Sequence, residues 1–270
     1  MSNIAKSSQN LRWMDNQSDK NTIIHRINPV IKLVVSLIYI FTIISFDNYS
    51  PERLIPFIFY IFIVSSLAEI SLIHLLKLSA VSLPLIIGIG IFNPIFNREV
   101  AYYIGSIPIS FGMLSFCTLF IKSLMTVISG LLLVATTGIN NLGMALRKIG
   151  LPKIFAVQIM LTYRYITVFM EEVNTTLTAH SLRANNKGVS YKSYGYLVGN
   201  ILLRTIDRSQ KIYEAMCLRG FHGDYVTGKN PKINKTDIIY LAVWSSLFIF
   251  IRYYNLSQII NDFVGRMNGT

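Results

Sequence analysis

The chain has 270 residues, of which 52% are hydrophobic and 14% are charged, and its formal net charge is +12. A soluble domain of this length would carry about 25% charged residues, so the composition excludes an ordinary soluble protein and indicates side chains that face lipid. The sequence has no motif of interleaved basic and aromatic residues of the kind that binds nucleic acid. The positive charge therefore fits cytoplasmic loops beside anionic lipid and not a nucleic-acid partner.

Residues 1–29 are polar and of mixed charge. They lack the short apolar core and small-residue cleavage site of a signal peptide. We therefore expect a loosely ordered N-terminal tail, and its Lys and Arg residues place it in the cytoplasm.

Residues 30–136 hold four apolar stretches, over 30–46, 54–70, 83–96 and 111–136. A hydrocarbon layer about 30 Å thick needs roughly 17–25 residues of helix, so we predict four transmembrane helices here.

Three features modify these spans. Lys32 is expected to snorkel from the start of the first span to the head groups. A short link bearing His74 and Lys77 precedes the third span. The third span contains prolines and glycines, which predict a kinked, short or partly re-entrant helix.

Lys122 is the single charge within the fourth span. A cation inside the membrane is by default a functional candidate. A lysine that faces a polar groove, or that pairs with Glu69, explains it equally well, and the sequence leaves both open.

The character changes over residues 137–237, which hold 14 of the 25 Lys and Arg residues. After four crossings from an inside N-terminus, the positive-inside rule places this region in the cytoplasm. Residues 238–254 form a last transmembrane helix, and 255–270 form a C-terminal tail. Five crossings fit best; six would require that the apolar stretch Ile154–Met170 also enters the membrane.

Two series of apolar residues within the basic region recur at steps of three and four, which predicts two long amphipathic helices. The first series starts at Leu161 and ends near Arg183, and the second runs from Leu202 to Arg219, just before Gly220. Asn and Gly residues follow these ends, as is typical of helix C-termini. The sequence therefore predicts an all-α, polytopic membrane bundle with two cytoplasmic helices, each ending in an arginine.

Several kinds of chemistry are missing from the sequence. It has no Gly-Lys-Ser/Thr phosphate loop, no His-Glu-x-x-His pair and no paired carboxylates within its spans. We therefore predict no catalytic residue, no metal site and no cofactor. A stand-alone membrane enzyme acting on lipid substrates would need such a cluster, so this alternative is disfavoured.

The run from Arg208 to Phe221, Arg-Ser-Gln-Lys-Ile-Tyr-Glu-Ala-Met-Cys-Leu-Arg-Gly-Phe, strongly resembles the signature of the T components of energy-coupling factor (ECF) transporters, the CbiQ/EcfT family. It is most similar to the cobalt/nickel branch. Further stretches that resemble the family are Asn28–Leu33, Leu133–Thr137, Leu161–Tyr165 and Glu171-Glu172.

The resemblance implies a non-enzymatic coupling subunit of an ATP-driven importer in the cell membrane, whose partners are two ATP-binding cassette ATPases and a membrane substrate-binding (S) subunit. The family carries two Ala-Arg-Gly-like triplets at the ends of its coupling helices. They correspond here to Leu182-Arg183-Ala184 and Leu218-Arg219-Gly220. In the first triplet Leu182 and Ala184 stand where the family has Ala and Gly, and in the second Leu218 replaces Ala. Both arginines are present and are expected to contact the ATPases.

The cargo implied by this branch of the family is cobalt or nickel. A T component that serves another substrate, such as a vitamin, is the alternative. A membrane scaffold or channel without ATPase partners is a third interpretation.

Overall fold

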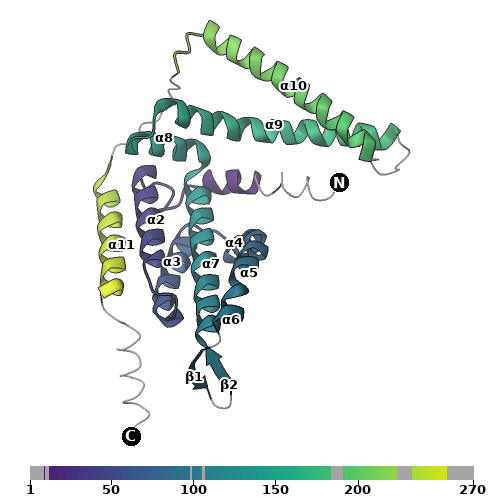
Figure 1. Cartoon of the computed structure of the whole chain (residues 1–270). Coiled ribbons are helices and arrows are strands. Elements are labelled where there is room, and N and C mark those ends of the chain that lie inside the picture. The colour runs from purple at the N-terminus through teal and green to yellow at the C-terminus, as the bar shows by residue number, and fades with distance from the viewer. Residues whose placement is uncertain are drawn as a thin grey trace. The chain divides into compact units, whose positions relative to one another are not determined.

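The computed structural model describes residue 9 and residues 12–97, 99–104, 107–183, 191–223 and 233–253 (Figure 1). The chain divides into two compact units. We call Gln17–Gly138 with Pro231–Thr270 the bundle unit, and Met1–Asn16 with Ile139–Asn230 the hairpin unit.

The bundle unit confirms the predicted all-α membrane bundle. Its helical elements are α2 (Pro29–Ile44), η1 (Pro51–Phe57), α3 (Ile58–Leu67), α4 (Leu72–Ser79), η2 (Ala80–Ser82), α5 (Leu83–Gly90), α6 (Phe92–Phe96), α7 (Phe111–Thr137) and α11 (Lys235–Tyr253). The sequence analysis missed a short antiparallel hairpin between α6 and α7, formed by β1 (Val100–Ile104) and β2 (Ile107–Ser110).

Aromatic side chains of α2, α3 and α11 form a cluster in the core of the bundle unit. Tyr39 of α2 lies with its ring centroid 4.5 Å from that of Tyr60 of α3, and Tyr60 lies 4.8 Å from Trp244 of α11. Tyr39 and Phe248 are fully buried. Because such rings bury large apolar areas, this cluster holds α11 against helices more than 180 residues earlier in the chain.

Among the residues that the structure describes, three helical stretches are long and apolar enough to cross a membrane: Leu72–Phe96, Phe111–Thr137 and Lys235–Tyr253. The 16-residue α2 is a shorter apolar helix. The helix that a sixth crossing would need, α9 (Lys153–Arg183), is not among the three. The number of crossings stays a prediction.

The stretch Leu72–Phe96 corrects one detail of the sequence analysis. The predicted link at His74 and Lys77 is wrong, because both residues lie in α4. The helical path is nevertheless interrupted, by the 3-10 turn at Ala80–Ser82 and again at Ile91. Prolines and glycines here weaken the continuous α-helical hydrogen bonding, as predicted.

The hairpin unit consists of α8 (Ile139–Ile149), α9 (Lys153–Arg183) and α10 (Tyr191–Leu218). In Figure 1, α9 and α10 run in opposite directions. The sequence analysis predicted α9 and α10 but missed α8. Gly143 of α8 allows close packing on α9, since a Cβ atom there would lie 2.9 Å from Cγ of Met160.

The prediction of a loosely ordered N-terminal tail is wrong for residues 12–18, which are helical. Arg12 Nη2 donates to Glu171 Oε1 at 2.7 Å, and the Tyr163 hydroxyl donates to Asp15 Oδ1 at 2.6 Å. Burial and the bond to the Asp15 carboxylate raise the pKa of Tyr163, so its hydroxyl remains a donor at neutral pH. The start of the chain thus packs on α9.

Candidate functional site

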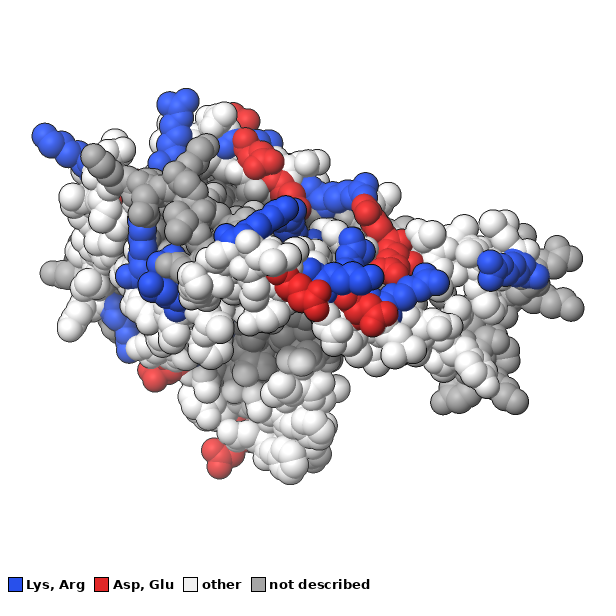
Figure 2. Space-filling view, turned by 90° about the horizontal axis from the view of Figure 1, so that it is seen from above, with Lys and Arg blue, Asp and Glu red and all other residues white. Residues whose placement is uncertain are grey.

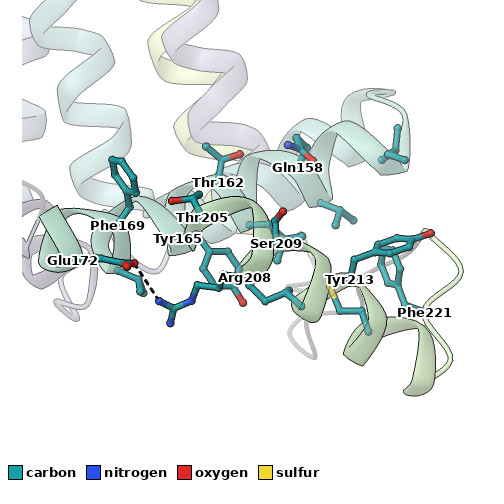
Figure 3. Close-up of a pocket in the computed structure, with 16 residues that line it drawn as sticks. Gln158, Thr162, Tyr165, Phe169, Glu172, Thr205, Arg208, Ser209, Tyr213 and Phe221 are labelled. Carbon is teal, nitrogen blue, oxygen red and sulfur yellow. Dashed lines mark ion pairs between the residues drawn. The ribbon is translucent and has the colours of Figure 1, made fainter. Parts of the chain in front are cut away.

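An apolar groove of about 530 Å³ lies between α9 and α10. Figure 3 shows that both helices contribute side chains to it. The lining includes Leu161, Tyr165 and Val168 of α9, and Ile212, Tyr213 and Met216 of α10. All six belong to the two amphipathic series in the sequence, so the predicted apolar faces meet in one groove.

Ion pairs connect the two helices beside this groove. Glu172 of α9 lies 3.9 Å from Arg204 and 3.8 Å from Arg208 of α10, as the dashed line in Figure 3 marks for Arg208. Half-exposed pairs of this kind contribute about 0–1 kcal/mol to stability. These ion pairs place Glu172 beside Arg208, the first residue of the Arg208–Phe221 run.

The end of α10 is closed by a Schellman motif. Phe221 N donates to Met216 O at 3.0 Å, and Gly220 N donates to Cys217 O at 2.9 Å. This motif requires a left-handed residue after the helix, and Gly220 has φ +80°. Because Gly220 turns the chain sharply, Leu218 is left 90% exposed and Arg219 projects at the very end of the helix.

The end of α9 also presents an arginine. Arg183 is its last residue and is exposed, and Leu182 beside it is 73% exposed. Ala184, the third member of this triplet, lies outside the described residues. Within the part of the chain that the structure describes, neither the Arg183 nor the Arg219 guanidinium takes part in an ion pair. Both arginines are exposed at these helix ends.

Exposed charges of both signs lie along α10. Figure 2 shows basic and acidic side chains interspersed on the face that it presents. The exposed charged residues of α10 include Arg204, Asp207, Arg208, Lys211 and Glu214. Such a mixture favours contacts with individual side chains over attraction by one extended field.

The remaining candidate, Lys122, lies in the bundle unit, away from this site in the chain. Its Nζ donates to Phe46 O at 2.6 Å and to Asn48 Oδ1 at 2.9 Å, just beyond the end of α2. Glu69, the partner considered from the sequence, instead has its carbonyl oxygen bonded by Lys20. Lys122 therefore has a local anchoring contact, since a cation at a helix C-terminus satisfies its free carbonyl groups.

Two charged residues of the bundle unit were misjudged or missed from the sequence. Lys32 does not snorkel; it is 4% exposed and donates to Thr136 O at 2.7 Å. Asp237 is 2% exposed and was not singled out. No sequence signal could have joined them, because their partners lie 104 and 209 residues away.

Among the described residues, no group of three His, Cys, Asp or Glu side chains is arranged to hold a metal ion. The exposed cysteines, Cys117 and Cys217, are both free.

Comparisons with known proteins match the sequence of this chain to a transport family. The family model described as CbiQ, cobalt transport protein, matches residues 20–229. An uncharacterized protein of Methanocaldococcus jannaschii, MJ1089, is 26% identical over 93% of this chain and 96% of its own. A second uncharacterized protein of that organism, MJ1571, is 27% identical over 80% of this chain and 74% of its own. The nickel permease LarQ of Lactiplantibacillus plantarum is 28% identical over 44% of this chain and 45% of its own.

Proposed function

Because this chain belongs to the CbiQ family of cobalt transport proteins, we propose that it is the transmembrane coupling subunit of an ATP-driven, ECF-type importer. In this proposal two ATP-binding cassette ATPases hydrolyse the nucleotide, and a separate membrane S subunit captures the substrate. The chain itself performs no catalysis. It transmits the motion of the ATPases to the S subunit.

The observation that carries the proposal is the pair of exposed arginines at the ends of α9 and α10. A helix C-terminus favours a cation, and a guanidinium offers planar donors that fit a carboxylate in two places. We propose that Arg183 and Arg219 each enter an acidic groove of one ATPase. Leu182 and Leu218 would supply apolar contact beside them, while Gly220 fixes the geometry of the second tip.

The groove between α9 and α10 supports a second contact. Its lining is mostly apolar, and it is open in the isolated chain. An S subunit is itself a membrane protein with apolar helices, so we propose that one of its helices packs along this groove. The two partners would then bind different parts of the same hairpin, with ATPases at the tips and the S subunit along the faces.

The proposed cargo is Co²⁺ or Ni²⁺. The description of the family and the similarity to a nickel permease support this choice. A vitamin carried by a different S subunit is the alternative. For either cargo, we propose that the N-terminus, α9 and α10 lie on the cytoplasmic side of the membrane. The reason is that the positive-inside rule places the basic region 137–237 there.

Uptake of labelled Co²⁺ and Ni²⁺ tests the proposal in cells that express the ATPases and the S subunit with or without this chain. We expect ATP-dependent metal uptake only when the chain is present. Labelled vitamin serves as the parallel substrate, and vitamin uptake alone would correct the cargo. Equal metal uptake without the chain, or uptake with the chain alone and no ATPases, would contradict a coupling role and favour the channel interpretation.

A further inference from the structure

Three helix ends of the bundle unit meet around buried charged groups. Asp237, in the first turn of α11, accepts hydrogen bonds through both carboxylate oxygens: from Asn28 N at 2.9 Å and from Asn234 N at 2.8 Å. Asn28 is the N-cap residue of α2. One carboxylate therefore satisfies backbone donors at the start of the first and the last helix of the bundle unit.

A buried cation complements this carboxylate. Lys32, in the first turn of α2, donates from Nζ to the carbonyl oxygen of Thr136, in the last turn of α7, at 2.7 Å. Lys32 and Asp237 also interact electrostatically with each other. The pair thus joins α2, α7 and α11.

The signs of these charges match the helix ends that they contact. Helix N-termini carry free N–H groups and partial positive charge, whereas C-termini carry free carbonyl groups and partial negative charge. The carboxylate lies at two N-termini and the ammonium lies at one C-terminus. Because these groups are almost completely removed from water, loss of one partner leaves an uncompensated buried charge.

The residues of this cluster lie close in sequence to the places where the chain passes between the two units. The chain passes between the bundle unit and the hairpin unit at residues 16–17, 138–139 and 230–231. Thr136 lies two residues before Gly138, where the second connection begins, and Asn234 and Asp237 come after the third. The hydrogen bonds of Lys32 and Asp237 therefore hold Thr136 and Asn234, which are described residues on the bundle-unit side of these two connections.

From this juxtaposition we propose that Lys32 and Asp237 form a joint that transfers movement of the hairpin unit to α7 and α11. Both are positioning residues, and the inference rests on the proposed coupling function. A force that arrives through the connection after Gly138 would reach α7 and α11 together, because α2 contacts α7 through Lys32 and α11 through the Asn28–Asp237 hydrogen bond. Without the pair, α7 and α11 would respond separately and part of the movement would be lost.

The test uses the complete importer purified with its ATPases and S subunit and reconstituted in lipid vesicles, with ⁶³Ni²⁺ uptake and ATP hydrolysis measured on the same samples. Asp237→Asn keeps the size of the side chain and removes its charge. We expect this variant to assemble and hydrolyse ATP, while nickel uptake per ATP falls about tenfold, the scale expected for loss of coupling between distant sites. Glu52→Gln, which removes an exposed carboxylate from the same unit, should leave the ratio unchanged.

The double variant Lys32→Met/Asp237→Asn separates coupling from folding. Removing both charges should restore thermal stability relative to Asp237→Asn, because no unpaired charge stays buried. We expect uptake per ATP to remain low in the double variant, and this measurement also decides the matter if Asp237→Asn fails to assemble. Normal uptake per ATP in the double variant would overturn the inference and leave a purely structural pair. Absence of ATP-dependent uptake with the wild-type chain would instead contradict the proposed function, and the inference about Lys32 and Asp237 would then also be wrong.

Discussion

Replacement of both Arg183 and Arg219 with Glu should release the ATPases from the purified complex and abolish uptake. The two guanidiniums are exposed at the ends of α9 and α10, where we propose that acidic grooves receive them. Truncating one partner of a buried, hydrogen-bonded charge pair costs about 2–5 kcal/mol, and reversal of the charge adds repulsion. Two such losses should reduce the affinity of the ATPases for this chain by several orders of magnitude. Co-purification shows whether the ATPases are retained, and binding of the ATPases to the immobilised chain measures the affinity.

A matched control reverses two other charges in the hairpin unit. Lys148 of α8 and Arg164 of α9 are exposed and lie outside the Arg208–Phe221 run and away in sequence from Arg183 and Arg219. The double variant Lys148→Glu/Arg164→Glu should therefore retain the ATPases. If the tip variant retained them as well as this control does, the proposed role of the arginines would be wrong.

Replacement of Ile212 with Asp should release the S subunit while the ATPases remain bound. Ile212 lines the apolar groove between α9 and α10, and a carboxylate there would be desolvated without a partner when an apolar helix packs on it. The expected cost is several kcal/mol, so little S subunit should co-purify and uptake should fall to background. Quantitative immunoblotting of both partners in one purification measures the two effects together.

Leu203 provides the control for this second variant. It lies on the same helix, is 63% exposed and does not line the groove. Leu203→Asp should retain both partners. Loss of the ATPases together with the S subunit from Ile212→Asp, but not from Leu203→Asp, would argue that the substitution disrupts the hairpin and that the groove is not a separate docking surface.

The helices α9 and α10 could be predicted because their signals are local. The apolar spacing predicts α9 and α10, and the Arg219-Gly220 pair marks a helix end that the structure shows as a Schellman motif with Gly220 at φ +80°. Helix type and helix end depend on residues within a few positions of each other. The same holds for the family resemblance, which rests on the contiguous run Arg208–Phe221.

What the sequence could not predict depends on distant partners. The sequence predicts that Lys32 snorkels, because its hydrogen bond to the carbonyl oxygen of Thr136 depends on tertiary structure. The carboxylate of Asp237 likewise accepts a hydrogen bond from Asn28 N, 209 residues away in the chain. The helix at residues 12–18 similarly packs on α9 through contacts that span about 150 residues. Periodicity carries no information about such pairs, because burial of a charge depends on the tertiary contacts around it.

Site-specific photocross-linking from the end of α10 tests whether this chain binds an ATPase there. A photoreactive amino acid at Leu218, which is 90% exposed beside Arg219, should cross-link to an ATP-binding subunit in intact cells, in a band that antibodies to that subunit recognise. The same probe at Ile239 of α11, which is 61% exposed on an apolar span, should not. Absence of an ATPase adduct from position 218 in cells with normal metal uptake would contradict the coupling role assigned to this chain.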